Sequence, residues 1–285
     1  MPPEKPLVVT LISDLFLAAP VEQAVRAAGY RLERIERGSD LEPDAPPERE
    51  RVYLGEPLAG RGAAFIRRLA GWRPAVIIVE LSSTSIPWAD WIAAAKSSPA
   101  TRRIPVIGFG PHTDLDLRAQ AIDAGCDLVV AKSRLLSALP ELIEKYARVV
   151  DYAGLEVDCQ GELSELAVKG IELFNARAYF EAHEELELAW GAETRPVREL
   201  YRGILQVAVA YLHISRHNYR GAMKLFLRMR QWLDPLPDVC LGVNVAQLRV
   251  EALAARAEVE RLGPEGIADF NLSLLKPVQV RQRSS

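Results

Sequence analysis

The chain has 285 residues, of which 49% are hydrophobic and 26% charged, and its formal net charge is −3 at pH 7. This composition is typical of a globular protein with more than one domain, and the small negative charge disfavours nucleic acid as a partner. No run of about 18 apolar residues predicts a membrane span, and residues 1–6 lack the pattern of a signal peptide, so we expect a cytoplasmic protein without membrane association. The three cysteines are far apart and predict neither a disulfide framework nor a metal clamp.

The first half alternates apolar runs with amphipathic segments. Strands are expected at residues 7–13, 30–35, 75–80, 104–109 and 127–131, and helices at 18–28, 62–72, 88–95, 115–124 and 137–149. Residues 37–61 are rich in proline, glycine and charge and predict a loop. Five strands alternating with five helices predict an α/β domain over residues 1–150, with a parallel sheet covered on both faces.

The segment Ala124-Gly125-Cys126-Asp127-Leu128-Val129-Val130-Ala131-Lys132-Ser133 resembles the final strand and lysine of a response-regulator receiver domain. The resemblance covers residues 7–150 and implies a flavodoxin-like five-stranded sheet. It also implies a phosphoryl-transfer pocket that needs Mg²⁺, two acids, an aspartate acceptor, a small hydroxyl residue and the lysine.

This pocket is degenerate in the present sequence. Asp14 is the one acid where two are expected, Glu80 stands at the acceptor position, and Gly110 replaces the hydroxyl residue, whereas Lys132 is kept. Magnesium needs several oxygen ligands, so we expect a pseudo-receiver without Mg²⁺-dependent phosphorylation. Glu80 facing Lys132 could hold one conformation or form a structural ion pair.

The second half is predicted to be an all-α helical bundle over residues 162–263, after a linker at 151–161 and before a loose tail at 264–285. Helices are expected at 162–175, 178–190, 196–216, 219–233 and 243–262. A weak internal repeat places Tyr179 and Ala182 40 residues before Tyr219 and Ala222. Two copies are too few for a solenoid, and a compact bundle fits better.

The ordered pattern from Phe174-Asn175 through His183-Glu184, Arg202-Gly203 and Gln206 to Asn218 and Gly221-Ala222 resembles domain of unknown function family 309, a helical-bundle family. The resemblance covers residues 162–233 or beyond, and no activity is established for that family. A receiver-like domain in front of such a bundle suggests a regulatory setting by analogy.

A polar cluster is predicted within this bundle. Phe180, His183, Glu187 and Trp190 recur at helical spacing, so a histidine and a carboxylate share a face with two aromatic rings. A polar stripe on the next predicted helix could meet that face. The ligand-binding candidates are His183, Glu184, Glu187, Arg202, Gln206 and His213, and within them His183, Glu187 and His213 could hold a divalent transition metal.

Three interpretations remain open at this point: a structural hydrogen-bond network, a metal or catalytic site, and a site for an organic or anionic ligand. The leading hypothesis is a regulatory or binding protein that takes a small ligand or a protein partner, with homo-oligomerisation left open. The alternative is a metal-dependent hydrolase-like enzyme centred on His183, Glu187 and His213. The sequence does not decide whether the protein is an enzyme.

Overall fold

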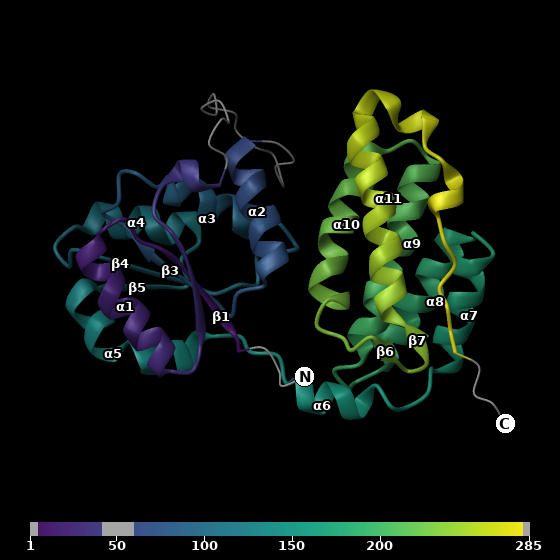
Figure 1. Ribbon diagram of the computed structural model, residues 1–285, viewed down its shortest axis with the longest axis horizontal. Helices are drawn as coiled ribbons and strands as arrows, with labels where there is room; N and C mark the ends of the chain where they lie inside the picture. The colour runs from purple at the N-terminus through teal and green to yellow at the C-terminus, as the bar shows by residue number, and fades with distance from the viewer. Residues whose placement is uncertain (1–4, 42–59, 282–285) are drawn as a thin grey trace. The chain divides into compact units, whose positions relative to one another are not determined.

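The computed structural model describes residues 5–41 and 60–281. The chain divides into two compact units, residues 1–149 and 150–285, and each is described by itself (Figure 1). Most of the loop expected at 37–61 lies outside the described residues, although a short 3₁₀ helix at Gly38–Asp40 precedes the gap. Within the described ranges, no helix is long and apolar enough to cross a membrane. The cytoplasmic location stays a prediction.

The first unit is built on a five-stranded sheet. Its strands are β1 (Leu7–Leu11), β2 (Arg31–Ile35), β3 (Val76–Glu80), β4 (Val106–Gly110) and β5 (Leu128–Ala131). They pair in parallel in the order β2-β1-β3-β4-β5. The near-continuous apolar composition of β1, β3 and β4 follows from burial on both faces. The strand order is flavodoxin-like, and the predicted fold class is confirmed.

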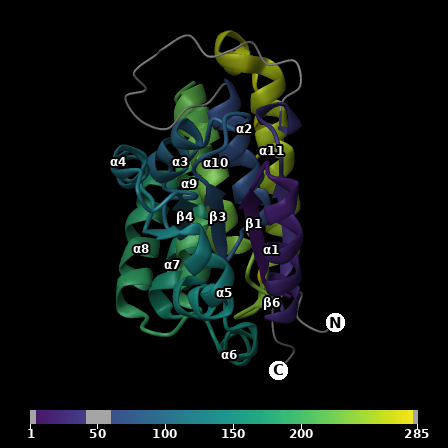
Figure 2. The ribbon, with the colours of Figure 1, turned by 90° about the vertical axis from the view of Figure 1, so that its left-hand side faces the viewer.

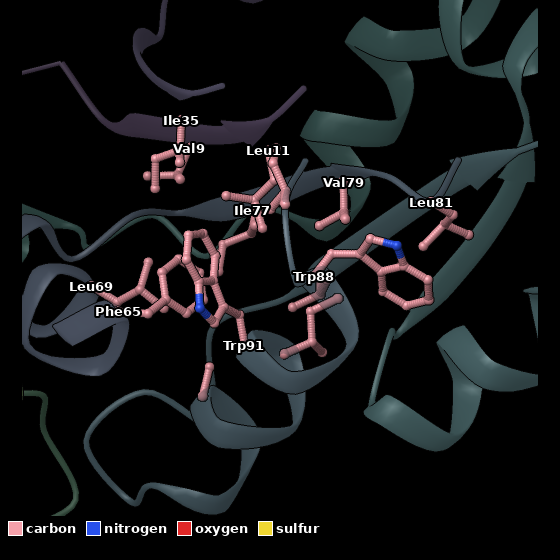
Figure 3. Close-up of a cluster of buried hydrophobic side chains, with 14 of the residues drawn as sticks. Val9, Leu11, Ile35, Phe65, Leu69, Ile77, Val79, Leu81, Trp88 and Trp91 are labelled. Atoms are coloured by element: carbon pink, nitrogen blue, oxygen red, sulfur yellow. The ribbon is translucent and has the colours of Figure 1, made fainter. Parts of the chain in front are cut away.

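Five helices cover the two faces of this sheet: α1 (Leu15–Ala27), α2 (Gly60–Trp72), α3 (Trp88–Ser97), α4 (Leu115–Ala124) and α5 (Lys132–Tyr146). One core packs α2, α3 and α4 against the sheet, with Phe65 and Trp91 stacked at 4.9 Å between ring centroids (Figure 3). The other core packs α1 and α5 on the opposite face. Since parallel strands end at one edge, residues 13, 80, 110 and 132 gather there.

The second unit is a bundle whose long helices run side by side in two perpendicular views (Figures 1 and 2). Its helices are α6 (Tyr152–Asp158), α7 (Glu165–Asn175), α8 (Tyr179–Ala192), α9 (Arg198–Ser215), α10 (Tyr219–Leu233) and α11 (Val245–Gly266). The short strands β6 (Val239–Cys240) and β7 (Val243–Asn244) form a hairpin before α11, and the 3₁₀ turns Ile267–Asp269 and Leu272–Leu274 follow it.

The internal repeat corresponds to two helix hairpins that turn in the same way. Arg177 between α7 and α8 has φ 62°, and His217 between α9 and α10 has φ 53°. In each turn the next amide donates to a carbonyl five residues back, Ala178 to Leu173 and Asn218 to His213. The same helix-ending hydrogen bond therefore positions Tyr179 and Tyr219 at the start of their helices.

The expectations about the linker and about the cysteines of the second unit were wrong. The supposed linker at 151–161 contains α6, and Cys159 at its end forms a disulfide with Cys240, so the prediction of no disulfide fails as well. The two cysteines are 81 residues apart, and only the fold brings them together. Disulfides are more typical of oxidising compartments than of the cytosol.

The tail from residue 264 is docked rather than loose over its described length. Ile267, Phe270, Leu275 and Val278 are buried, and Val280 pairs with Val243. Asn175 holds this segment from the end of α7: its Nδ2 donates to the Val278 carbonyl at 3.0 Å, and its Oδ1 accepts from the Val278 amide at 2.7 Å.

Candidate functional site

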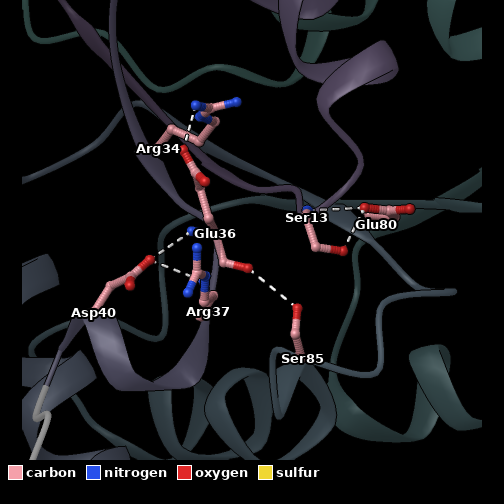
Figure 4. A network of polar contacts seen from close by, with 7 residues as sticks. All are labelled: Ser13, Arg34, Glu36, Arg37, Asp40, Glu80 and Ser85. Atoms are coloured by element: carbon pink, nitrogen blue, oxygen red, sulfur yellow. Dashed lines mark hydrogen bonds and ion pairs between the residues drawn. The ribbon is translucent and has the colours of Figure 1, made fainter.

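The carboxylate of Glu80 is the best-satisfied buried charge of the first unit. The residue ends β3 and is 6% exposed. Its Oε2 accepts from the Ser13 amide at 2.9 Å, the Ser13 hydroxyl at 3.2 Å and the Asp14 amide at 3.1 Å. Its Oε1 accepts from the Ser82 hydroxyl at 3.3 Å. Figure 4 shows Glu80 turned toward Ser13, at the connection between β1 and α1. Four donors thus stabilise a charge that burial alone would penalise.

Lys132 does not pair with Glu80 as one interpretation of the sequence expected. Its Nζ lies 3.7 Å from Asp14 Oδ2, and both side chains are substantially exposed. Asp14 also caps α1, because its Oδ1 accepts from the Phe16 amide at 2.8 Å. The lysine therefore forms an exposed ion pair with the capping acid, which contributes little to stability. The ionic partners at this edge are Asp14 and Lys132, and Glu80 forms a separate buried hydrogen-bonded group.

Gly110, at the end of β4, lies beside two leucine side chains. A Cβ added there would lie 3.4 Å from Leu117 Cδ2 and 3.5 Å from Leu81 Cβ. The glycine is thus surrounded by leucines and supplies no hydroxyl to the edge. Ser13, Ser83 and Ser85 form a small hydroxyl chain nearby, with 2.9 Å between Ser13 Oγ and Ser83 Oγ.

In the helical unit, the face of α8 expected to be buried is not its core face. The buried residues of α8 are Tyr179, Ala182, Leu186 and Ala189. Phe180 is 50% exposed and the Glu187 side chain 61% exposed. The predicted set and the buried set of residues both recur at helical spacing, and which set is buried depends on the helices that pack against α8. The His183–Glu187 contact, 3.8 Å between Nε2 and Oε2, is a pair along one helix, and Glu184 beside it is exposed.

His213 belongs to the turn between α9 and α10. Its Nδ1 lies 3.1 Å from Asn218 Nδ2, and the Asn218 Oδ1 accepts from the Gly221 amide at 2.9 Å. The ring packs so closely that a Cβ on Gly221 would lie 2.5 Å from Nδ1. Burial, with Arg216 nearby, lowers the pKa of His213. The imidazole of His213 thus packs within the turn between α9 and α10 and helps to order it.

Arg202 lies between two aromatic rings. Its guanidinium carbon is 4.0 Å from the Trp232 ring centroid and 4.8 Å from that of Trp190, which also receives Arg198 at 4.3 Å. Such cation–π contacts join α8, α9 and α10 and account for Arg202 as a packing residue. Within the described part of the chain, no hydrogen bond joins Gln206 to His183, Glu187 or His213.

The six candidates therefore do not form one cluster. His183, Glu184 and Glu187 lie on the surface of α8, His213 in a helix turn, Arg202 in an arginine–tryptophan stack, and Gln206 half-buried on α9. Among residues 5–41 and 60–281, no group of three or more histidine, cysteine, aspartate or glutamate side chains could hold a metal ion. The proposed metal ligands His183, Glu187 and His213 form no such group. No geometry in the described chain favours the metal-dependent hydrolase, and whether the protein binds a metal is a separate, untested question.

Sequence reasoning missed several residues that build these sites. Ser13 directly precedes Asp14 and Ser82 lies two residues after Glu80, so closeness in sequence to an acid of the predicted pocket was a usable signal. Asn175 follows the last apolar residue of α7 and was visible as a helix-end asparagine. Its partner Val278 lies 103 residues away, and no local pattern indicates that contact.

Solved structures similar to the chain are receiver domains. Chemotaxis protein CheY4 of Vibrio cholerae is 13% identical, with 50% of this chain and 98% of that chain covered and a TM-score of 0.37. The receiver domain of a sensor histidine kinase from Pseudomonas aeruginosa PAO1 is 13% identical; the match covers 50% of this chain and 97% of that chain, with a TM-score of 0.38. A response-regulator receiver domain from Rhodospirillum rubrum is 19% identical; the match covers 50% of this chain and 96% of that chain, with a TM-score of 0.37. At these scores the fold assignment rests on the chain's own strand order.

Residues 167–225 match the family model described as Domain of unknown function (DUF309). The match runs from within α7 into α10 and includes both helix hairpins, so the predicted resemblance of this segment is confirmed. No curated protein matches the sequence significantly. The chain thus combines a receiver-like α/β unit with a helical unit that carries a DUF309 match.

Proposed function

We propose that this protein is a regulatory binding protein whose receiver-like unit works without phosphoryl transfer. The observation that carries the proposal is the state of Glu80. A phosphoryl acceptor needs a free carboxylate oxygen that can attack phosphorus, and Oε2 of Glu80 already accepts three hydrogen bonds. Oε1 accepts a further bond from the Ser82 hydroxyl, so in this buried residue an attack by either oxygen would compete with hydrogen bonds already made.

The surrounding residues support the same conclusion. The Glu80 carboxylate holds the start of α1 in place through the amides of Ser13 and Asp14, so it joins the end of β3 to the connection between β1 and α1. A permanent contact of this kind gives one conformation rather than a switch between two. The unit then serves as a fixed surface, and regulation comes from what binds to the protein.

Intact-mass spectrometry after incubation with acetyl phosphate and Mg²⁺ tests the proposal, with a phosphorylatable receiver domain as positive control. We expect no phosphoryl adduct on the wild-type protein and no change in the amide-exchange rates of residues 13–16. An adduct on the wild type that disappears in Glu80→Gln would overturn the proposal. An adduct that persists in Glu80→Gln and maps to another residue of the first unit, such as Asp14, would also overturn the proposal.

A further inference from the structure

The first unit contains a cavity of about 310 Å³ at the carboxyl edge of its sheet. It lies beside the exits of β4 and β5, and its lining continues into the first turns of α4 and α5. This volume is at the lower end of the range for small-molecule sites. The cavity is distinct from the hydrogen-bonded group of Glu80, which does not line it.

The inner wall of the cavity is apolar. Leu81 from the exit of β3, Leu117 from α4 and Val129 from β5 line it, and all three belong to the same core. Gly110 keeps this wall open, because a side chain there would meet Leu81 and Leu117 at ordinary contact distance and extend into the space. Such a wall suits a hydrocarbon or aromatic body of a few carbon atoms.

The mouth of the cavity is cationic. Arg118 from α4 and Arg134 from α5 line it together with His112, and neither arginine forms an ion pair with a carboxylate of the described residues. The acid in the lining, Asp114, is already engaged, since its Oδ1 accepts from the Leu117 amide at 2.9 Å as the cap of α4. The two guanidinium groups and the one capping carboxylate together give the opening a net positive charge.

We propose that this cavity binds a small amphipathic anion, with its apolar part against the leucine wall and a carboxylate or phosphate head at Arg118 and Arg134. Guanidinium groups form paired hydrogen bonds with both kinds of head group. An apolar wall alone would accept neutral molecules, and arginines alone would attract any anion. Because the cavity combines the two, it selects a ligand that has both an apolar part and a negative charge. The inference goes beyond the proposed function, because it concerns a site that Glu80 does not touch.

Isothermal titration calorimetry of the full chain with phenyl phosphate and with hexanoate tests the proposal, with inorganic phosphate and hexanol as single-feature probes. We expect saturable binding of phenyl phosphate or hexanoate, and at least tenfold weaker binding of both single-feature probes. Arg118→Gln and Arg134→Gln should each weaken binding by about tenfold, since each removes a charge-assisted hydrogen bond. Arg148→Gln is the matched control, because Arg148 is exposed and its amide bonds Ala75 at the opposite edge of the sheet.

The proposal is overturned if neither amphipathic probe binds saturably, or if binding is unchanged in both arginine variants. Equal affinity for inorganic phosphate would also overturn it, since the apolar wall would then contribute nothing. Both variants change exposed side chains, and an unchanged thermal midpoint confirms that each is folded. A phosphoryl adduct on Glu80 would refute the proposed function and leave this proposal standing.

Discussion

Two acidic residues of this protein, Glu80 and Glu187, show how differently a carboxylate can be held. Glu80 is buried at a strand end and accepts hydrogen bonds from the start of the neighbouring helix. Glu187 is largely exposed on α8 and approaches only His183, at 3.8 Å. A buried charge must be satisfied by specific partners, whereas an exposed one is satisfied by water. The first therefore determines the local structure, and the second is free of that constraint.

Among the substitutions that test this comparison, Glu80→Ala is expected to have the largest effect on stability. The substitution leaves the amides of Ser13 and Asp14 without their acceptor, and it should lower the free energy of unfolding of the first unit by about 3 kcal/mol. Native-state hydrogen exchange of amides in β1 and β3 measures this value. Glu80→Gln, which keeps one carbonyl acceptor, should lose less than half as much. Equal losses in the two variants would contradict this expectation, because the carbonyl acceptor kept in Glu80→Gln would then contribute nothing to stability.

A smaller effect is expected from Asn175→Ala in the helical unit, where a neutral side chain plays the part that Glu80 plays in the sheet. Loss of two hydrogen bonds to Val278 should cost about 1–2 kcal/mol and release the docked tail. Faster amide exchange over residues 275–281 is the expected readout. Gln279→Ala, at an exposed position of the same segment, is the control. Unchanged exchange in Asn175→Ala would mean that the buried tail residues hold the segment unaided.

The smallest effect is expected from His183→Ala and Glu187→Ala. Because the pair is exposed and lies along one helix, each substitution should change stability by less than about 0.5 kcal/mol. Thermal unfolding of both variants, beside Leu186→Ala as a buried control on the same helix, measures the contrast. Elemental analysis of chelator-free protein completes the test. Stoichiometric metal in the wild type that both variants lose would restore the enzyme hypothesis.

The α/β half of the fold was predictable because its signals are local. Continuous apolar strands, their alternation with amphipathic helices, and the glycine that ends α4 are all visible within short windows of sequence. The start of α5 was missed by five residues, since backbone at Ala138 departs from helical geometry and interrupts the pattern. The loss of the phosphoryl-transfer pocket was also predictable, because Glu80 and Gly110 differ from the receiver pattern at the ends of predicted strands.

Sequence alone determined the two-part architecture, the flavodoxin-like sheet, the DUF309-like helix pattern and the identities of Asp14, Glu80 and Lys132. Only the tertiary structure decided that Lys132 pairs with Asp14, that α8 buries Tyr179 and Leu186 instead of Phe180 and Glu187, and that Cys159 bonds Cys240. Helical periodicity restricts which residues share a face, but the packing partner selects the buried face. Contacts across 66 or 81 residues depend on chain topology, which no local spacing records.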